Sequence, residues 1–126
     1  MLTNFFPAPP YSIPSNATGW SYCSTVSGGL TGTGPASAVT TPGTAQFTYV
    51  TGVQAMNSSL TVNTEFIVKI GSTQVFRGYA QAAGGGVAAA FWPPLKSSAV
   101  NMGVTVETNV ATPGSGLLVN LQGFTA

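Results

Sequence analysis

Glycine and proline interrupt this chain so often that no segment keeps the period of a long helix. The 126 residues include 16 glycines and 9 prolines, which divide the chain into short segments. Apolar and polar side chains alternate within many of these segments, as they do in strands with one buried face. Roughly seven or eight such segments, spaced about ten residues apart, predict an all-β antiparallel sandwich. We expect a jelly-roll-like or a related Greek-key topology.

The strand pattern is clearest in the middle of the chain and at its end. Residues 65–70 and 74–80 are separated by Gly71-Ser72-Thr73, which is short enough for the connection of a β-hairpin. On the first strand of this hairpin, Phe66, Val68 and Ile70 should share one face. We expect the other strands at residues 20–26, 46–55, 60–63, 87–91, 103–110 and 117–124.

Glycines and prolines also shape the expected connections. Gly84-Gly85-Gly86 is not followed by the Lys and the Ser or Thr of a phosphate-binding loop, so we interpret it as a link between strands. Pro93-Pro94 should end the strand at 87–91, because proline has no N–H to donate to a sheet ladder. Residues 28–43 should form a loop, because they are rich in glycine and proline.

The first 18 residues differ from the rest of the chain. They contain 4 of the 9 prolines. Proline fixes φ and removes backbone donors, so this stretch should be an extended Pro-rich N-terminal arm. We therefore expect an arm at residues 1–18 and a single sandwich domain at residues 19–126.

We expect the arm to make apolar contacts across subunits, because exposed aromatic side chains are unfavourable in water. Packing of the arm on its own domain is the alternative. Trp92, beside Pro93-Pro94, is a candidate second anchor, although a position facing the core is equally compatible with the sequence. The interface residues expected on the arm are Phe5, Phe6, Pro9, Pro10 and Tyr11.

The chain carries five charged side chains and no aspartate or histidine: Glu65, Lys69, Arg77, Lys96 and Glu107. Acid–base catalysis and metal binding need clustered ionisable side chains, so we expect no enzyme activity, no metal site and no cofactor. A glycosidase that uses both glutamates is the alternative that the sequence leaves open. Three dispersed basic residues make no patch for nucleic acid. We expect Glu65 to pair with Lys69 or Arg77, and Glu107 with Lys96.

The surface should be polar but almost uncharged. The net charge is +1, and the chain has 12 serines and 17 threonines. Such a surface does not repel a second copy, so we interpret the protein as a component of an assembly; a small neutral globular domain is the alternative. No signal peptide and no apolar run of about 18 residues is present, so we expect neither secretion nor membrane insertion. We expect Cys23 to pack in the core.

The second half of the chain resembles small bacteriophage capsid proteins of the decoration, or cement, class. The resembling segments lie within residues 46–126 and are 74–79 (QVFRGY), 82–87 (AAGGGV), 91–95 (FWPPL) and 118–124 (LVNLQGF). The resemblance implies a β-sandwich on the outer capsid surface of a virion, as a dimer or trimer, that bridges subunits of the major capsid protein of a virus without catalysis. The arm lies outside the resembling region, and no single functional residue carries over.

Two other functions are compatible with the same strands. A receptor-binding or carbohydrate-binding β-sandwich of a phage tail fibre or adhesin would need a concave polar pocket with converging aromatic and amide side chains. The aromatic candidates for such a sugar platform are Trp20, Tyr22, Tyr79 and Trp92. A module of a bacterial surface layer would also suit the low charge, but it would require an export signal.

Overall fold

The described part of the chain is built from strands and turns. The computed structural model describes residues 13–24, 29–30, 32–39, 45–110 and 116–126, and none of these residues is helical. Its strands are β1 (Thr18–Cys23), β2 (Ala36–Val39), β3 (Thr48–Asn57), β4 (Thr64–Ile70), β5 (Thr73–Ala80), β6 (Gly86–Lys96), β7 (Val104–Thr108) and β8 (Leu117–Thr125).

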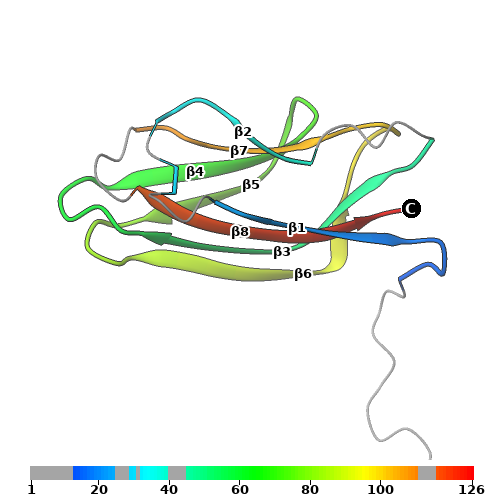
Figure 1. The fold of residues 1–126 in the computed structure, drawn as a ribbon, viewed down its shortest axis with the longest axis horizontal. Helices are drawn as coiled ribbons and strands as arrows, with labels where there is room; N and C mark the ends of the chain where they lie inside the picture. The colour runs from blue at the N-terminus through cyan, green and yellow to red at the C-terminus, as the bar shows by residue number, and fades with distance from the viewer. Residues whose placement is uncertain (1–12, 25–28, 31, 40–44, 111–115) are drawn as a thin grey trace, which may run out of the picture.

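The strands form two stacked antiparallel sheets, ordered β1-β8-β3-β6 and β2-β7-β4-β5 (Figure 1). The first strand pairs with the eighth, the second with the seventh, the third with the sixth and the fourth with the fifth. The chain is thus one long antiparallel ribbon that wraps over itself, and the β3–β8 and β4–β7 pairs join the ribbon into two sheets. This strand order is that of a jelly roll, and the predicted all-β sandwich is confirmed.

The core lies between the sheets and is filled by alternate side chains of their central strands. On β4 the three residues expected to share a face, Phe66, Val68 and Ile70, are all buried there. At one edge, rings from both sheets meet: Phe76 of β5 lies 5.3 Å from Phe91 of β6 between ring centroids. The other fully buried apolar side chains among the described residues are Val50, Val53, Ala80, Val104, Val106, Leu117, Val119 and Leu121.

The predicted hairpin is present as β4 and β5. Its connection is a tight turn at Gly71, which has a φ of 63°, a value that favours glycine. Ile70 and Thr73 are the last paired residues before this turn. The strands expected at 103–110 and 117–124 are also present, as β7 and β8.

The prediction that Pro93-Pro94 ends the strand at 87–91 is wrong. β6 continues to Lys96. Val50 pairs with Leu95 and Gly52 with Ala90, so residues 91–94 bulge opposite Thr51 alone. Because β6 is an edge strand, the missing proline N–H groups leave no partner strand unsatisfied.

Three smaller expectations were also wrong. Residues 60–63 lie in the loop between β3 and β4 rather than in a strand, and β2 lies inside the segment that we expected to be a loop. Cys23 is exposed rather than buried. On β1 the alternate residues Trp20 and Tyr22 take the inward positions and pack on the core. Because side chains alternate between the two faces of a strand, Cys23 points outward.

Close packing between Gly78 and Phe66 gives a test of the core. A Cβ atom at Gly78 would lie 2.4 Å from Cε1 of Phe66, and that ring is fully buried. We expect Gly78→Ala to lower the free energy of unfolding by about 1–3 kcal/mol in urea denaturation. Gly19→Ala is the control, because a Cβ there meets only the Gly123 carbonyl oxygen, at 4.0 Å. The control should keep or raise the stability, and equal losses in both variants would contradict this packing.

Candidate functional site

One face of the sandwich combines exposed side chains with an absence of charge. Over most of its length, the outer surface of the β1-β8-β3-β6 sheet presents small, amide or apolar side chains. Lys96 lies at the far end of β6, with its Nζ 4.0 Å from the centroid of the Phe47 ring. We call the uncharged remainder the neutral face; its outward residues are Ser21, Cys23, Gln54, Met56, Ala88, Ala90, Leu118, Asn120 and Gln122.

A pair of amides is fixed at the centre of the neutral face. Gln54 Nε2 donates to Gln122 Oε1 at 3.2 Å, and Gln122 Nε2 donates to Gln54 Oε1 at 2.9 Å. Gly52 leaves room for this pair, because a Cβ atom there would lie 2.8 Å from Gln122 Oε1. The two amides satisfy each other across β3 and β8, so the face is polar here without carrying charge.

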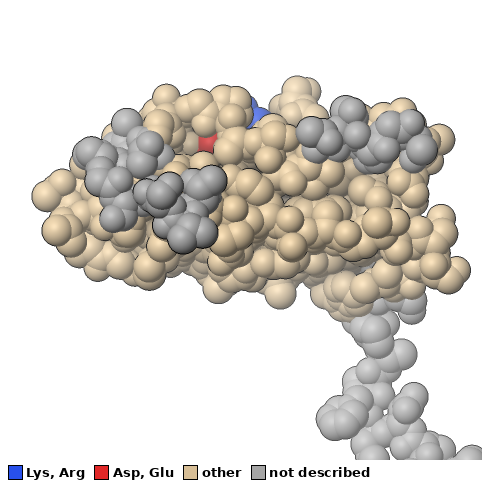
Figure 2. Space-filling model, viewed as in Figure 1, with Lys and Arg blue, Asp and Glu red and all other residues tan. Residues whose placement is uncertain are grey.

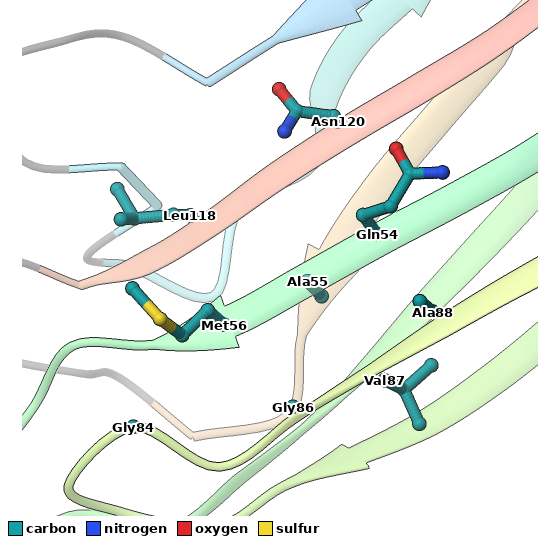
Figure 3. Close-up of a pocket in the computed structure, with 9 residues that line it drawn as sticks. All are labelled: Gln54, Ala55, Met56, Gly84, Gly86, Val87, Ala88, Leu118 and Asn120. Atoms are coloured by element: carbon teal, nitrogen blue, oxygen red, sulfur yellow. The ribbon is translucent and has the colours of Figure 1, made fainter.

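Beside the amide pair the neutral face is hollowed by a shallow depression of about 530 Å³ (Figure 3). Met56 and Leu118 point into one side of it, and the Gln54 and Asn120 amides stand along another. Gly84 and Gly86 have no side chains to fill the end near the β5–β6 loop. The remaining lining residues are Ala55, Val87 and Ala88.

The loops at this end of the sandwich are tied together by a buried asparagine. The Asn57 side chain is fully buried. Its Nδ2 donates to the carbonyl oxygens of Val62, at 2.7 Å, and Ala80, at 3.0 Å, while its Oδ1 accepts from the backbone N–H of Ser59 at 3.0 Å. The backbone of Asn57 bonds to the neighbouring loop as well, because its N–H donates to the Gly85 carbonyl at 2.8 Å. One side chain thus holds the β3–β4 loop against β5.

This network fixes an exposed apolar side chain at the tip of the β3–β4 loop. Leu60 is 82% exposed. The adjacent β5–β6 loop is held by the Ala83 N–H, which donates to the Ser59 carbonyl at 2.7 Å, and by the Ala82 N–H, which donates to Asn63 Oδ1 at 2.7 Å. Neither loop contains a charged residue, so the uncharged surface continues from the neutral face over this end.

The opposite sheet carries most of the charge. Figure 2 shows the coloured charged atoms gathered near the β7 and β4 side of the molecule. Arg77 of β5 pairs with Glu65 of β4, as expected. Lys69 Nζ lies 2.6 Å from Glu107 Oε1, so the expected pairing of Glu107 with Lys96 is wrong. Lys69 and Glu107 occupy adjacent strands of one sheet, whereas Lys96 belongs to the other sheet.

Of the interface residues expected from the sequence, Trp92 alone lies among the described residues. Its side chain is 39% exposed and stands in the bulge of the edge strand β6. The expected arm contacts therefore stay predictions. The five that lie outside the described residues are Phe5, Phe6, Pro9, Pro10 and Tyr11.

The four aromatic residues considered for a sugar platform do not converge. Trp20 and Tyr22 pack on the core from β1, Trp92 lies on the opposite edge of the same sheet, and Tyr79 lies on the other sheet. Burial, and to a smaller extent the neighbouring Cys23 thiolate, raises the pKa of Tyr22. Trp20 Nε1 is buried and has no hydrogen-bond acceptor among the described residues.

Neither metal chemistry nor a helical membrane span finds support in the described residues. They contain no group of three or more His, Cys, Asp or Glu side chains that could hold a metal ion. They also contain no helix with the length and hydropathy needed to cross a bilayer.

Comparisons with known proteins found only weak structural similarity. No protein-family model matches the chain, and no curated protein matches it. The chain is similar to a chain in the cryo-EM structure of a virus-like particle of the extra small virus of the giant freshwater prawn Macrobrachium rosenbergii. The similarity covers 99% of this chain and 95% of that chain, at 12% identity and a TM-score of 0.40. A TM-score this low does not support a fold assignment, so the assignment of a jelly roll rests on the strand order of this chain.

The Asn57 network gives a test of how the loop end is held. Asn57→Ala leaves a buried carbonyl group, a partly buried carbonyl group and a buried N–H without their partner, so we expect the free energy of unfolding to fall by about 2–3 kcal/mol. Asn63→Ala is the control, because it removes one hydrogen bond from an exposed asparagine. For Asn63→Ala the free energy of unfolding should fall by less than about 1 kcal/mol in the same urea titration. A smaller loss for Asn57→Ala than for Asn63→Ala would show that the loops are held by other contacts.

Proposed function

We propose that this protein is a non-enzymatic structural component of a viral shell, which acts through uncharged surfaces. The observation that carries the proposal is the placement of charge. Glu65, Arg77, Lys69 and Glu107 are paired with one another on one sheet, and Lys96 lies over an aromatic ring. The neutral face and the adjoining loop end are left for contacts that need neither charge steering nor proton transfer.

The jelly-roll fold is compatible with several different functions. Jelly rolls occur in viral capsid proteins, lectins and cupins, so the activity has to be argued from the residues. Metal chemistry of the cupin kind has little support in a chain without histidine or aspartate. Sugar binding has one supporting feature, the amides of Gln54 and Asn120 beside the depression, but among the described residues no aromatic side chain lines the depression.

More specifically, we propose a decoration protein that binds the outer surface of a phage capsid and bridges subunits of its major capsid protein. The resemblance of residues 46–126 to that class supports this role. The low charge supports self-association into a dimer or trimer, since copies do not repel one another. We propose that the arm residues make apolar contacts across subunits and that Trp92 is a second anchor.

The direct test is to mix the purified protein with expanded, undecorated phage capsids. Saturable co-sedimentation and a higher disruption temperature of the particles would support the cement role. Closed particles formed by this chain alone would replace it with the role of the shell subunit itself. Failure to bind capsids, together with binding in a glycan screen, would favour the carbohydrate-binding alternative.

Removal of the arm tests its part in binding. We expect deletion of residues 1–14 to weaken capsid binding while the sandwich stays folded, because β1 begins only at Thr18. Co-sedimentation gives the affinity, and far-UV circular dichroism with urea denaturation reports the fold. Equal affinity of the truncated and full chains would remove the arm from the interface.

The placement of charge also predicts the response to salt. Interactions between unpaired surface charges weaken as ionic strength rises, whereas apolar and amide contacts do not. We expect the dissociation constant for capsids to change less than about threefold between 50 mM and 500 mM NaCl. A steep loss of binding with salt would show that an ionic contact dominates.

A further inference from the structure

We propose that the depression on the neutral face is the docking site for Phe5 and Phe6 of a neighbouring copy. This inference rests on the proposed role in a shell and names one contact between copies. The occupant is the N-terminal segment, residues 1–12, which lies outside the described residues.

The depression and the segment match in chemistry. Residues 1–12 contain three aromatic side chains and no charged one. Met56 is 45% exposed at the depression, and a thioether makes favourable contacts with aromatic rings. Leu118, Val87 and Ala88 add to the apolar part of the lining, and the volume of the depression, about 530 Å³, falls within the range of ligand-binding sites.

The amides beside the depression suit the backbone of this segment. Residues 7, 9 and 10 are prolines, so the segment offers carbonyl oxygens but few N–H groups. Asn120 is exposed, and among the described residues its side chain is in no hydrogen bond. Its two N–H donors are available to backbone carbonyls of a segment that lies in the depression.

The reach of the chain favours a neighbouring copy over the same copy. The chain enters the sandwich at Thr18, which pairs with Thr125, whereas the depression lies where Leu118 pairs with Met56. β8 rises about 17 Å from the level of Thr125 to Asn120 and about 24 Å to Leu118, and both Asn120 and Leu118 line the depression. Residues 6–13 span at most about 25 Å when fully extended, and the turn at Pro14–Ala17 precedes β1. The arm of the same copy could reach the near end of the depression at Asn120 but would have no slack at the apolar end formed by Met56 and Leu118, while the arm of a neighbour is not limited in this way.

A charge placed in the depression tests the site. Ala88 lines the depression, and Ala90 is exposed on the same face of the same strand but does not line it. We expect Ala88→Glu in the full chain to weaken self-association at least about tenfold in sedimentation velocity, whereas Ala90→Glu leaves it within about twofold. Equal effects of the two variants, or none from Ala88→Glu, would overturn the proposal.

Disulfide trapping separates a neighbour's arm from the arm of the same copy. In a Cys23→Ser background, one chain carries Phe6→Cys and a second carries Ala88→Cys; the two are mixed and oxidised with copper–phenanthroline. We expect at least about tenfold more cross-linked heterodimer than with Ser37→Cys, which lies on the opposite sheet, in place of Ala88→Cys. A chain with both cysteines that closes only within itself would overturn the assignment to a neighbour.

The two proposals fail independently. Capsid binding without the arm cross-link would overturn the docking site and keep the role in a shell. The cross-link without capsid binding or particle formation would keep the docking site and overturn that role.

Discussion

The reverse pairing of the first half of the chain with the second half is the constraint on which the rest of the structure depends. It places β3 beside β8 in one sheet and β4 beside β7 in the other. Residues that are far apart in the sequence become neighbours, such as Gln54 and Gln122 on one face, or Lys69 and Glu107 on the other. Both the amide pair and the ion pair therefore exist only once the jelly roll is complete, and such non-local contacts are formed at a cost in loop-closure entropy.

The sequence predicted local strand structure well and the arrangement of surfaces poorly. The β4–β5 hairpin was predictable because strict alternation is followed by Gly71. The extent of β6 was not, because the rule that proline ends a strand fails for an edge strand, and its edge position depends on the topology. The exposure of Cys23 could have been predicted from the alternation of side chains along β1, because Trp20 and Tyr22 take the inward positions.

The neutral face could not be predicted from the sequence for a related reason. Its members come from strands that are neighbours only in the folded sheet. Each outward residue, such as Met56 or Asn120, is unremarkable within its own strand, and the depression also depends on two residues without side chains, Gly84 in the β5–β6 loop and Gly86 at the start of β6. The scarcity of charged residues in the sequence indicated that the protein would have an uncharged surface, but it did not indicate which strands would form that surface.

A surface without charge needs other means to associate specifically. Its exposed edges are protected against indiscriminate pairing: β2 has four residues, β5 carries Arg77, and the bulge at Pro93-Pro94 interrupts β6. The neutral face instead offers shape and fixed hydrogen-bonding groups, and the buried Asn57 side chain holds the loops beside it in place. Because these groups are ordered before a partner arrives, association loses less conformational entropy than it would on a mobile surface. We therefore infer that specific association through this face, as proposed above, would depend on the rigidity of the sheet face and loop end rather than on the number of polar contacts.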